Sequence, residues 1–210
     1  MSAIGIFGGT FDPIHYGHLR TAFELLHELR LSEVRFIPSG DPPHRKGTLA
    51  DAETRLKMVT AAVSSEPRFT VDDCELQRAG PSFTVDTLDA IRAEFSSASL
   101  SLILGMDAFA GLTGWHRWDE LLDFAHIIVA HRPGWQPPDS GALGELLDKH
   151  ATRSVDDIHA ELSGRIYIHA VTQLEISSTE IRALIKTGGD PRFLMPDVVR
   201  ETISADGCYA

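Results

Sequence analysis

Short apolar runs alternate with longer amphipathic stretches along this chain. Apolar residues mark positions 4–7, 34–37, 69–71, 100–104, 127–130 and 166–170. Between these runs, apolar residues recur every three or four positions, which is typical of helices that bury one face. The runs at 100–104 and 127–130 are nearly continuous, as expected for parallel strands covered on both faces. The alternation predicts β-α units around a mostly parallel sheet, and therefore an α/β fold.

Three of the predicted helices have a clear inward face. The residues expected there are Leu19, Ala22, Phe23, Leu26 and Leu29 in the first helix, Leu56, Val59 and Val63 in the second, which starts near Asp51, and Val85, Leu88 and Ile91 in the third. Ser82 precedes the third helix and is predicted to be its N-cap. Ser177 and Glu180 form a Ser-x-x-Glu capping box for a further helix, which a glycine pair ends. A last short helix is expected after Pro196.

The length of the chain predicts a single domain. With 210 residues, it can bury roughly 70% of its unfolded surface without a disulfide or metal to hold it together. Residues 1–210 are therefore expected to form one domain. Residues 105–124 are expected to be a loop with one or two short helices. Residues 134–164 are richer in Pro, Gly and charge, and we interpret them as a variable excursion within that domain.

Charge and composition exclude several classes of protein. The formal net charge of −11 argues against broad binding to nucleic acid or anionic lipid, which requires clustered Lys and Arg. No stretch approaches the roughly 18 apolar residues of a membrane span, and the first residues lack the basic region of a signal peptide. Cys74 and Cys208 form no CxxC pair, which fits a reducing compartment. These features predict a cytoplasmic protein with no nucleic-acid or membrane partner.

The segment GGTFDPIHYGH at residues 8–18 joins the first strand to the first helix. Gly8 and Gly9 allow a sharp turn and close approach of a ligand to the backbone. The helix N-terminus beyond them offers N–H groups and a partial positive charge to an anion. His15 and His18 are three residues apart, so both can project from one side of the first turn and donate hydrogen bonds to phosphoryl oxygens. The loop is therefore a candidate phosphate site.

Other interpretations of this loop remain open on the residues alone. A glycine pair after a first strand is common in α/β folds. The loop is neither a GxGxxG dinucleotide fingerprint nor a GxxxxGK[ST] P-loop. His15 and His18 are also compatible with a zinc pair, although no third ligand stands out, and with two structural residues that cap the helix.

A second motif, ISSTEIR at residues 176–182, follows the last predicted strand. It places hydroxyl groups and N–H groups at a helix N-terminus, with Arg182 one turn further on. That arrangement suits a phosphate chain. The alternative is an ordinary capped helix with an arginine on its surface.

Both motifs resemble those of the nucleotidyltransferase superfamily, with its His-x-Gly-His loop and its ISSTxxR sequence. The resemblance implies a Rossmann-like, doubly wound parallel sheet with flanking helices in a single domain. It implies that His15, His18 and Arg182 are catalytic residues, which contact the triphosphate and stabilise charge during transfer. The residues it implies for ATP binding are Gly8, Gly9, Thr10, Phe11, His15, His18, Gly105, Asp107, Ile176, Ser177, Ser178, Thr179 and Arg182.

The middle of the chain resembles the bacterial branch of this superfamily that acts on nicotinate mononucleotide. The matching segments are 42–45, 81–88, 105–109 with Trp115, and 131–134. The resemblance covers nearly the whole chain, is weakest at 134–164, and departs from the family at Met106 and His116. It implies transfer of the adenylyl group of ATP to nicotinate mononucleotide, which gives nicotinate adenine dinucleotide and pyrophosphate in NAD biosynthesis. Mg²⁺ is expected to accompany ATP, without a protein metal site.

The acceptor residues also have chemical reasons. Trp115 offers a flat face on which a pyridine ring can stack, with Trp118 as the second choice and a core tryptophan as the alternative. Phe83 and Thr84 begin a helix whose N–H groups could hold a carboxylate. Asp107 follows a buried strand and could accept ribose hydroxyls. The full acceptor set is His44, Arg45, Phe83, Thr84, Trp115 and Arg132.

Four competing functions remain on the sequence. The same reaction could use nicotinamide mononucleotide or phosphopantetheine as its acceptor. A nucleotide sensor would bind ATP without releasing pyrophosphate. The catalytic domain of an aminoacyl-tRNA synthetase shares the His-x-Gly-His loop, but the chain shows no tRNA-binding domain. A zinc hydrolase would hold metal after purification. The sequence does not determine the oligomeric state, and a homo-oligomer is compatible with it.

Overall fold

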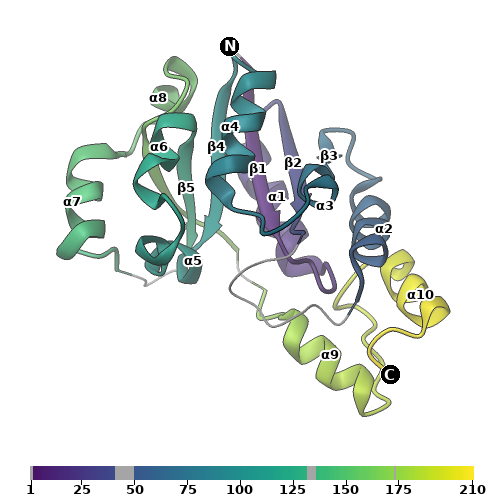
Figure 1. The fold of residues 1–210 in the computed structure, drawn as a ribbon. Helices are drawn as coiled ribbons and strands as arrows, with labels where there is room; N and C mark the ends of the chain where they lie inside the picture. The colour runs from purple at the N-terminus through teal and green to yellow at the C-terminus, as the bar shows by residue number, and fades with distance from the viewer. Residues whose placement is uncertain (1, 41–49, 132–135, 173) are drawn as a thin grey trace.

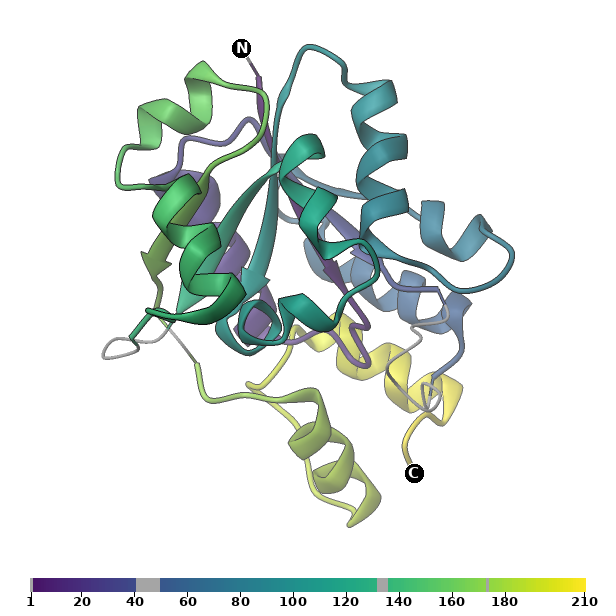
Figure 2. The ribbon, with the colours of Figure 1, turned by 60° about the vertical axis from the view of Figure 1, so that its left-hand side comes forward.

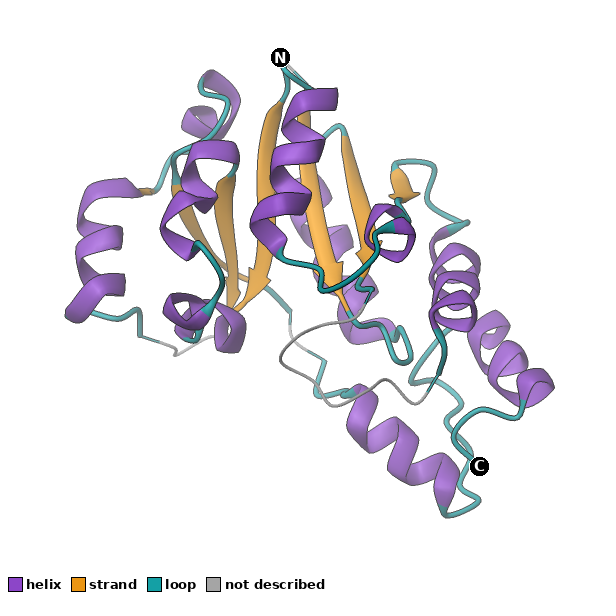
Figure 3. Ribbon diagram, in the orientation of Figure 1, coloured by secondary structure: helices purple, strands orange, loops and turns teal. Residues whose placement is uncertain are grey.

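A computed structural model describes residues 2–40, 50–131, 136–172 and 174–210. Within these ranges the strands form one seven-stranded sheet in the order β3-β2-β1-β4-β5-β7-β6, and every neighbouring pair is parallel (Figures 1 and 3). The strands are β1 (Ala3–Gly9), β2 (Glu33–Pro38), β3 (Phe69–Val71), β4 (Ser99–Gly105), β5 (His126–His131), β6 (Ala151–Thr152) and β7 (Ile166–Ala170). The predicted parallel α/β fold in a single domain is confirmed.

Helices cover both faces of this sheet (Figures 1 and 2). They are α1 (Tyr16–Glu28), α2 (Ala52–Val63), α3 (Cys74–Gln77), α4 (Thr84–Glu94), α5 (Met106–Ala110), α6 (Leu121–Phe124), α7 (Gly141–His150), α8 (Val155–Ala160), α9 (Ser178–Lys186) and α10 (Asp197–Asp206). Successive strand residues point to opposite faces, so Ile6 packs with α4 and α5 whereas Phe7 packs with α1 and α2. Two separate apolar cores result, one on each face.

The strand order reverses between β1 and β4. Residues 3–71 build the sheet outward on one side of this point, and residues 99–170 build it outward on the other. In sheets of this kind, ligands bind at the reversal, outside the carboxyl ends of the strands. Here those ends are Gly8-Gly9 of β1 and Gly105 of β4. Figures 1 and 2 both place α9 beyond this same edge of the sheet.

Two details of the helices differ from the prediction. Phe23 is 40% exposed and lies against His27, because the buried stripe of α1 runs through Ala22, Leu25 and Leu26 instead. Ser82 is not an N-cap: α4 begins one residue later, at Thr84, and the Ser82 hydroxyl donates to the carbonyl of Glu75 at 3.4 Å.

The short helices expected within 105–124 are present, and the excursion at 134–164 contains regular elements. Residues 105–124 hold α5, α6 and two 3₁₀ turns, Leu112–Gly114 and Trp118–Glu120. The stretch 134–164 holds α7, β6 and α8, and β6 pairs with β7 at the sheet edge. No helix in the described part of the chain is both long and apolar enough to cross a membrane.

Candidate active site

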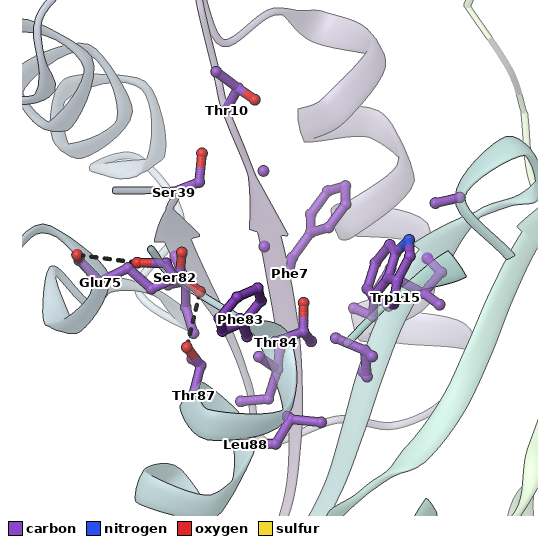
Figure 4. Close-up of a pocket in the computed structure, with 18 of the residues that line it drawn as sticks. Phe7, Thr10, Ser39, Glu75, Ser82, Phe83, Thr84, Thr87, Leu88 and Trp115 are labelled. Atoms are coloured by element: carbon purple, nitrogen blue, oxygen red, sulfur yellow. Dashed lines mark hydrogen bonds between the residues drawn. The ribbon is translucent and has the colours of Figure 1, made fainter. Parts of the chain in front are cut away.

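A cavity of about 310 Å³ opens at the point where the strand order reverses (Figure 4). Its wall is formed by residues 8–10 at the end of β1 and by Gly105 at the end of β4. Aliphatic strand residues form its floor. Figure 4 shows Phe83 and Thr84 entering from α4, with Trp115 on the other side. The structure therefore brings together four predicted ATP residues and three predicted acceptor residues, Gly8, Gly9, Thr10, Gly105, Phe83, Thr84 and Trp115.

Aromatic groups surround the cavity in an order that suits a flat ring. Trp115 is half-buried at its wall. The rings of Phe83 and His116 lie with centroids 4.3 Å apart and planes inclined by 35°. His116, where the family often has an aromatic residue, thus packs on Phe83 as an aromatic ring would. Trp118, the second choice for stacking, packs partly buried against the core and does not line this cavity.

Glu75 lines the same cavity and was missed by the sequence analysis. Its carboxylate accepts a hydrogen bond from the Thr87 hydroxyl at 2.9 Å, and burial raises its pKa above the ordinary value. The two residues come from α3 and α4, so this bond joins the short helix to the cavity wall. An isolated glutamate in a polar stretch carries no sequence signal for such a place.

His15 and His18 form the start of α1 in an unusual way. His15 is the N-cap, only 5% exposed, and its Nδ1 accepts the backbone N–H of Gly17 at 3.1 Å. The Nδ1 of His18 accepts the backbone N–H of His15 at 3.4 Å. The two rings stack with centroids 3.8 Å apart. Both histidines therefore cap the helix, as the alternative interpretation expected.

Capping determines which nitrogen of each ring carries the proton. Because Nδ1 of both His15 and His18 accepts a backbone hydrogen bond, the proton of each neutral ring is on Nε2. Burial lowers the pKa of His15 to about 4, so this ring is neutral at pH 7. The helix start therefore holds two oriented N–H donors. Capping and phosphate binding use different nitrogens and are compatible with each other.

The buried His15 predicts a pH-dependent stability. Its pKa is about 4 in the folded protein against an ordinary 6.5, so the folded state favours the neutral ring. The stabilisation is complete above pH 6.5 and is lost as the pH falls towards 4, by about 3 kcal/mol in total. Urea unfolding followed by circular dichroism between pH 7 and pH 4 should show this loss. His15→Asn retains a capping oxygen and should not show this loss of stability at low pH. An equal dependence of stability on pH in both proteins would contradict the assignment of the loss to His15.

Gly17 is needed between the two histidines. A Cβ at this position would lie 2.9 Å from the His15 ring and 3.4 Å from the carbonyl oxygen of Ile176. Contacts this close leave no room for a side chain. The glycine of the His-x-Gly-His sequence thus lets the ISSTEIR segment approach the histidine loop.

The ISSTEIR segment docks directly on the first loop. The Ser178 hydroxyl donates to the carbonyl of Pro13 at 3.0 Å, and Arg182 donates to the carbonyl of Asp12 at 2.7 Å. Arg182 also contacts the Thr179 hydroxyl at 3.3 Å. Ser177 is the N-cap of α9, where it accepts the N–H of Glu180. Two motifs far apart in the sequence therefore form one surface at the carboxyl edge of the sheet.

A buried arginine, also missed by the sequence analysis, supports this surface from below. Arg55 of α2 is 1% exposed and donates to the carbonyls of Thr10 at 2.9 Å and Ser39 at 2.8 Å. A third, longer bond of 3.3 Å reaches the carbonyl of Gly40. Arg55 thereby joins the loops after β1 and β2. An arginine four residues before the inward-facing Val59 was the available signal.

Three predicted acceptor residues, His44, Arg45 and Arg132, lie outside the described residues. Asp107 is exposed in the first turn of α5, next to Gly105. Phe11 is buried, with its ring 5.1 Å from that of His18, so it supports the histidine from the core side. Across the described part of the chain, no group of three or more His, Cys, Asp or Glu residues is placed to hold a metal ion.

The strand order of the parallel sheet reverses beside a loop suited to phosphate, and a second motif docks on that loop. Together these features define the nucleotidyltransferase class. A family profile described as cytidylyltransferase-like matches residues 6–184. A probable nicotinate-nucleotide adenylyltransferase of Aeromonas hydrophila is 48% identical over 206 residues, which cover 98% of this chain and 96% of that protein. One of Acidithiobacillus ferrooxidans is 46% identical, with 97% and 94% covered. The chain belongs to the cytidylyltransferase-like family and, within it, to the nicotinate-nucleotide adenylyltransferases.

A solved structure shows the same fold. The Plasmodium falciparum nicotinic acid mononucleotide adenylyltransferase, complexed with NaAD, aligns over 100% of this chain and 98% of its own with a TM-score of 0.75. Its sequence identity is 17%. The fold is therefore shared well beyond recognisable sequence similarity, and the protein is an enzyme of the transferase class.

Proposed function

We propose that this enzyme transfers the adenylyl group of ATP to nicotinate mononucleotide and releases pyrophosphate. The observation that carries the proposal is the junction of two unlike sites at residues 8–10. On one side lies the aromatic cavity with Trp115 and Phe83, and on the other the paired imidazoles with Arg182 docked beside them. A pyridine nucleotide fits the first site and a triphosphate fits the second, so their phosphates meet between them.

The ATP side is proposed to bind phosphates through donors. Nε2–H of His15 and of His18 would hydrogen-bond phosphoryl oxygens, while Ser178, Thr179 and Arg182 at the start of α9 would hold the outer phosphates. Gly8 and Gly9 admit the nucleotide close to the backbone. Asp107 would accept the ribose hydroxyls from the end of β4. Ile176 and Ser177 shape the same edge.

The acceptor side is proposed to bind the nicotinate ring by stacking. Trp115 would stack on the ring, with Phe83 on the far wall. No side chain caps α4 in the described structure, and a carboxylate is well placed beside the first-turn N–H groups of such a helix. His44, Arg45 and Arg132 are proposed to reach the acceptor phosphate from their loops.

The chemistry needs positioning more than it needs a protein base. The acceptor phosphate has its second pKa near ~6 and is largely dianionic at neutral pH. Its oxygen attacks the α-phosphorus of ATP in line; a P–O bond forms there as the bond to the pyrophosphate oxygen breaks. The donors at the start of α1 and α9 stabilise the charge that develops on the phosphoryl oxygens. A single displacement inverts configuration at the α-phosphorus.

The side chains proposed to contact the triphosphate, those of His15, His18, Ser178, Thr179 and Arg182, act as donors, which suit phosphate oxygens and not a bare cation. Mg²⁺ keeps several waters and is commonly bound through substrate phosphates. We therefore propose that Mg²⁺ enters with ATP, held by phosphate oxygens and water. When bound, it neutralises part of the charge on the leaving pyrophosphate.

The proposal is tested by supplying ATP and Mg²⁺ with nicotinate mononucleotide, nicotinamide mononucleotide or phosphopantetheine. Pyrophosphate release and formation of the dinucleotide product should be fastest with nicotinate mononucleotide. If turnover is faster with another acceptor, that acceptor is the substrate in place of nicotinate mononucleotide. ATP binding without pyrophosphate release would indicate a nucleotide sensor.

Trp115 offers a sharper test of the acceptor cavity. Base–aromatic stacking is worth about 1–3 kcal/mol by alanine substitution, so Trp115→Ala should raise KM for nicotinate mononucleotide about tenfold to a hundredfold. KM for ATP should change little. Trp118→Ala is the matched control, because Trp118 lies in the same segment but does not line the cavity. Equal effects of the two substitutions on KM would refute stacking on Trp115.

We also propose that the enzyme works in the cytoplasm. Both cysteines of the chain, Cys74 and Cys208, are free and half-buried, and burial raises the pKa of each thiol, most strongly for Cys74. Such unreactive, unpaired thiols fit a reducing compartment. Fractionation of cells that express the tagged protein tests this location.

A further inference from the structure

The segment after α10 turns back towards the active-site loop. Gly207 adopts a left-handed conformation, with φ of 64°, and the N–H of Cys208 closes the helix end on the carbonyl of Ile203 at 3.0 Å. The ring of Tyr209 then packs half-buried against the core on the α1 side of the sheet. Its hydroxyl donates to Oδ1 of Asp12 at 2.6 Å.

Asp12 connects this segment with two others. Its carboxylate is 6% exposed, and the same Oδ1 also accepts the backbone N–H of Ala50 at 3.2 Å. Nη1 of Arg182 donates to the backbone carbonyl of Asp12 at 2.7 Å and lies 3.9 Å from Oδ2. Arg182 is therefore held by the neutral carbonyl, while the carboxylate beside it is shared with Tyr209 and Ala50.

The distribution of these hydrogen bonds over the carbonyl and the carboxylate of Asp12 affects the position of Arg182. A buried carboxylate attracts a nearby guanidinium strongly, because charges interact more strongly away from water. Loss of one donor to Oδ1 would strengthen the pull of Asp12 on Arg182. A guanidinium that closed its present 3.9 Å ion pair with Oδ2 of Asp12 to hydrogen-bond distance would present fewer N–H groups to a phosphate.

We propose that Tyr209 is a positioning residue: by donating to Asp12, its hydroxyl keeps Arg182 on the Asp12 carbonyl, with the guanidinium directed to the triphosphate. This inference rests on the proposed phosphate-binding role of Arg182. Burial, and then the Asp12 carboxylate, raise the pKa of Tyr209 well above its ordinary range. The hydroxyl therefore remains a donor throughout the working pH range.

The competing explanation is that Tyr209 only anchors the last residues through its ring. Tyr209→Phe separates the two, because phenylalanine keeps the ring and its packing while losing the hydroxyl. We expect this variant to raise KM for ATP about tenfold, the scale for leaving a buried acceptor short of a donor. KM for nicotinate mononucleotide should stay within about twofold of the wild type, since the acceptor cavity lies on the other side of residues 8–10.

The decisive measurement adds Asp12→Asn to Tyr209→Phe. The asparagine keeps an oxygen for the Ala50 N–H but carries no charge to attract Arg182, so the double variant should recover most of the ATP affinity. Tyr167→Phe, on the half-buried tyrosine of β7, is the control. Thermal unfolding of each variant shows whether the fold is retained.

Each outcome decides between the explanations. Normal KM for ATP in Tyr209→Phe, or a double variant as impaired as the single one, would overturn the positioning role. Arg182→Gln is measured in parallel. If Arg182→Gln leaves the kinetics unchanged, the proposed phosphate site itself fails. If Arg182→Gln is impaired and Tyr209→Phe is not, only the present inference fails.

Discussion

His18→Ala is expected to lower kcat by about 10²–10³, the scale for removing one transition-state donor. Several contacts fix His18 for this role: its Nδ1 accepts the His15 N–H, one face stacks on His15, and Phe7 and Phe11 lie edge-on to it. The remaining N–H on Nε2 is thereby oriented before substrate binds. A donor that needs no reorganisation contributes most where charge develops.

Steady-state kinetics with both substrates measure this effect. The part of an interaction that forms only in the transition state lowers kcat and kcat/KM equally, so the fall in kcat should exceed any rise in KM for ATP. His27→Ala is the matched control: His27 is exposed on the same helix and contacts Arg68 and Phe23. Near-normal turnover of His18→Ala would remove this residue from the mechanism.

Arg55→Met is expected to lower the free energy of unfolding by about 3–5 kcal/mol, as for a buried charge removed from its partners. Methionine fills much of the same volume but donates no hydrogen bond. The carbonyls of Thr10 and Ser39 would then lose their donor, and the nearby Asp12 carboxylate would lose a compensating charge. The loops after β1 and β2 would separate at the cavity mouth.

Urea denaturation of both proteins gives this difference directly. Lys57→Met on the same helix is the control, since Lys57 makes an exposed ion pair with Asp206 and should cost at most about 1 kcal/mol. If Arg55→Met lowers the free energy of unfolding by as little, the three hydrogen bonds from Arg55 to carbonyls contribute little to stability.

Much of the fold was predictable because the sheet is buried on both faces. Strands covered by helices on either side are mostly apolar, so the apolar runs in the sequence coincide with β4 and β5. The two motifs were also predictable, since each combines a helix start with donors. The structure docks the two motifs on each other through Ser178 and Arg182, while their roles in phosphate binding stay predictions.

The predictions that failed concern residues whose partners lie outside their own helix. Serine is a favoured N-cap residue, yet the hydroxyl of Ser82 donates to the carbonyl of Glu75 and the helix starts later. The spacing of Arg55 from Val59 indicates an inward position, but its carbonyl partners come from loops that the sequence does not place beside it. Tyr209 carries no local pattern at all. Local propensity cannot indicate partners that only the tertiary structure supplies.

The docking of residues 178–209 on the first loop also has a consequence for biosynthesis. Ser178, Arg182 and Tyr209 reach partners 165, 170 and 197 positions earlier in the chain. During synthesis the ribosome releases the histidine loop early and Ser178, Arg182 and Tyr209 late. Contacts between positions so far apart also close slowly. The nascent enzyme can thus complete its sheet before it can handle a nucleotide, and catalytic competence arrives only once residues 178–209 have emerged.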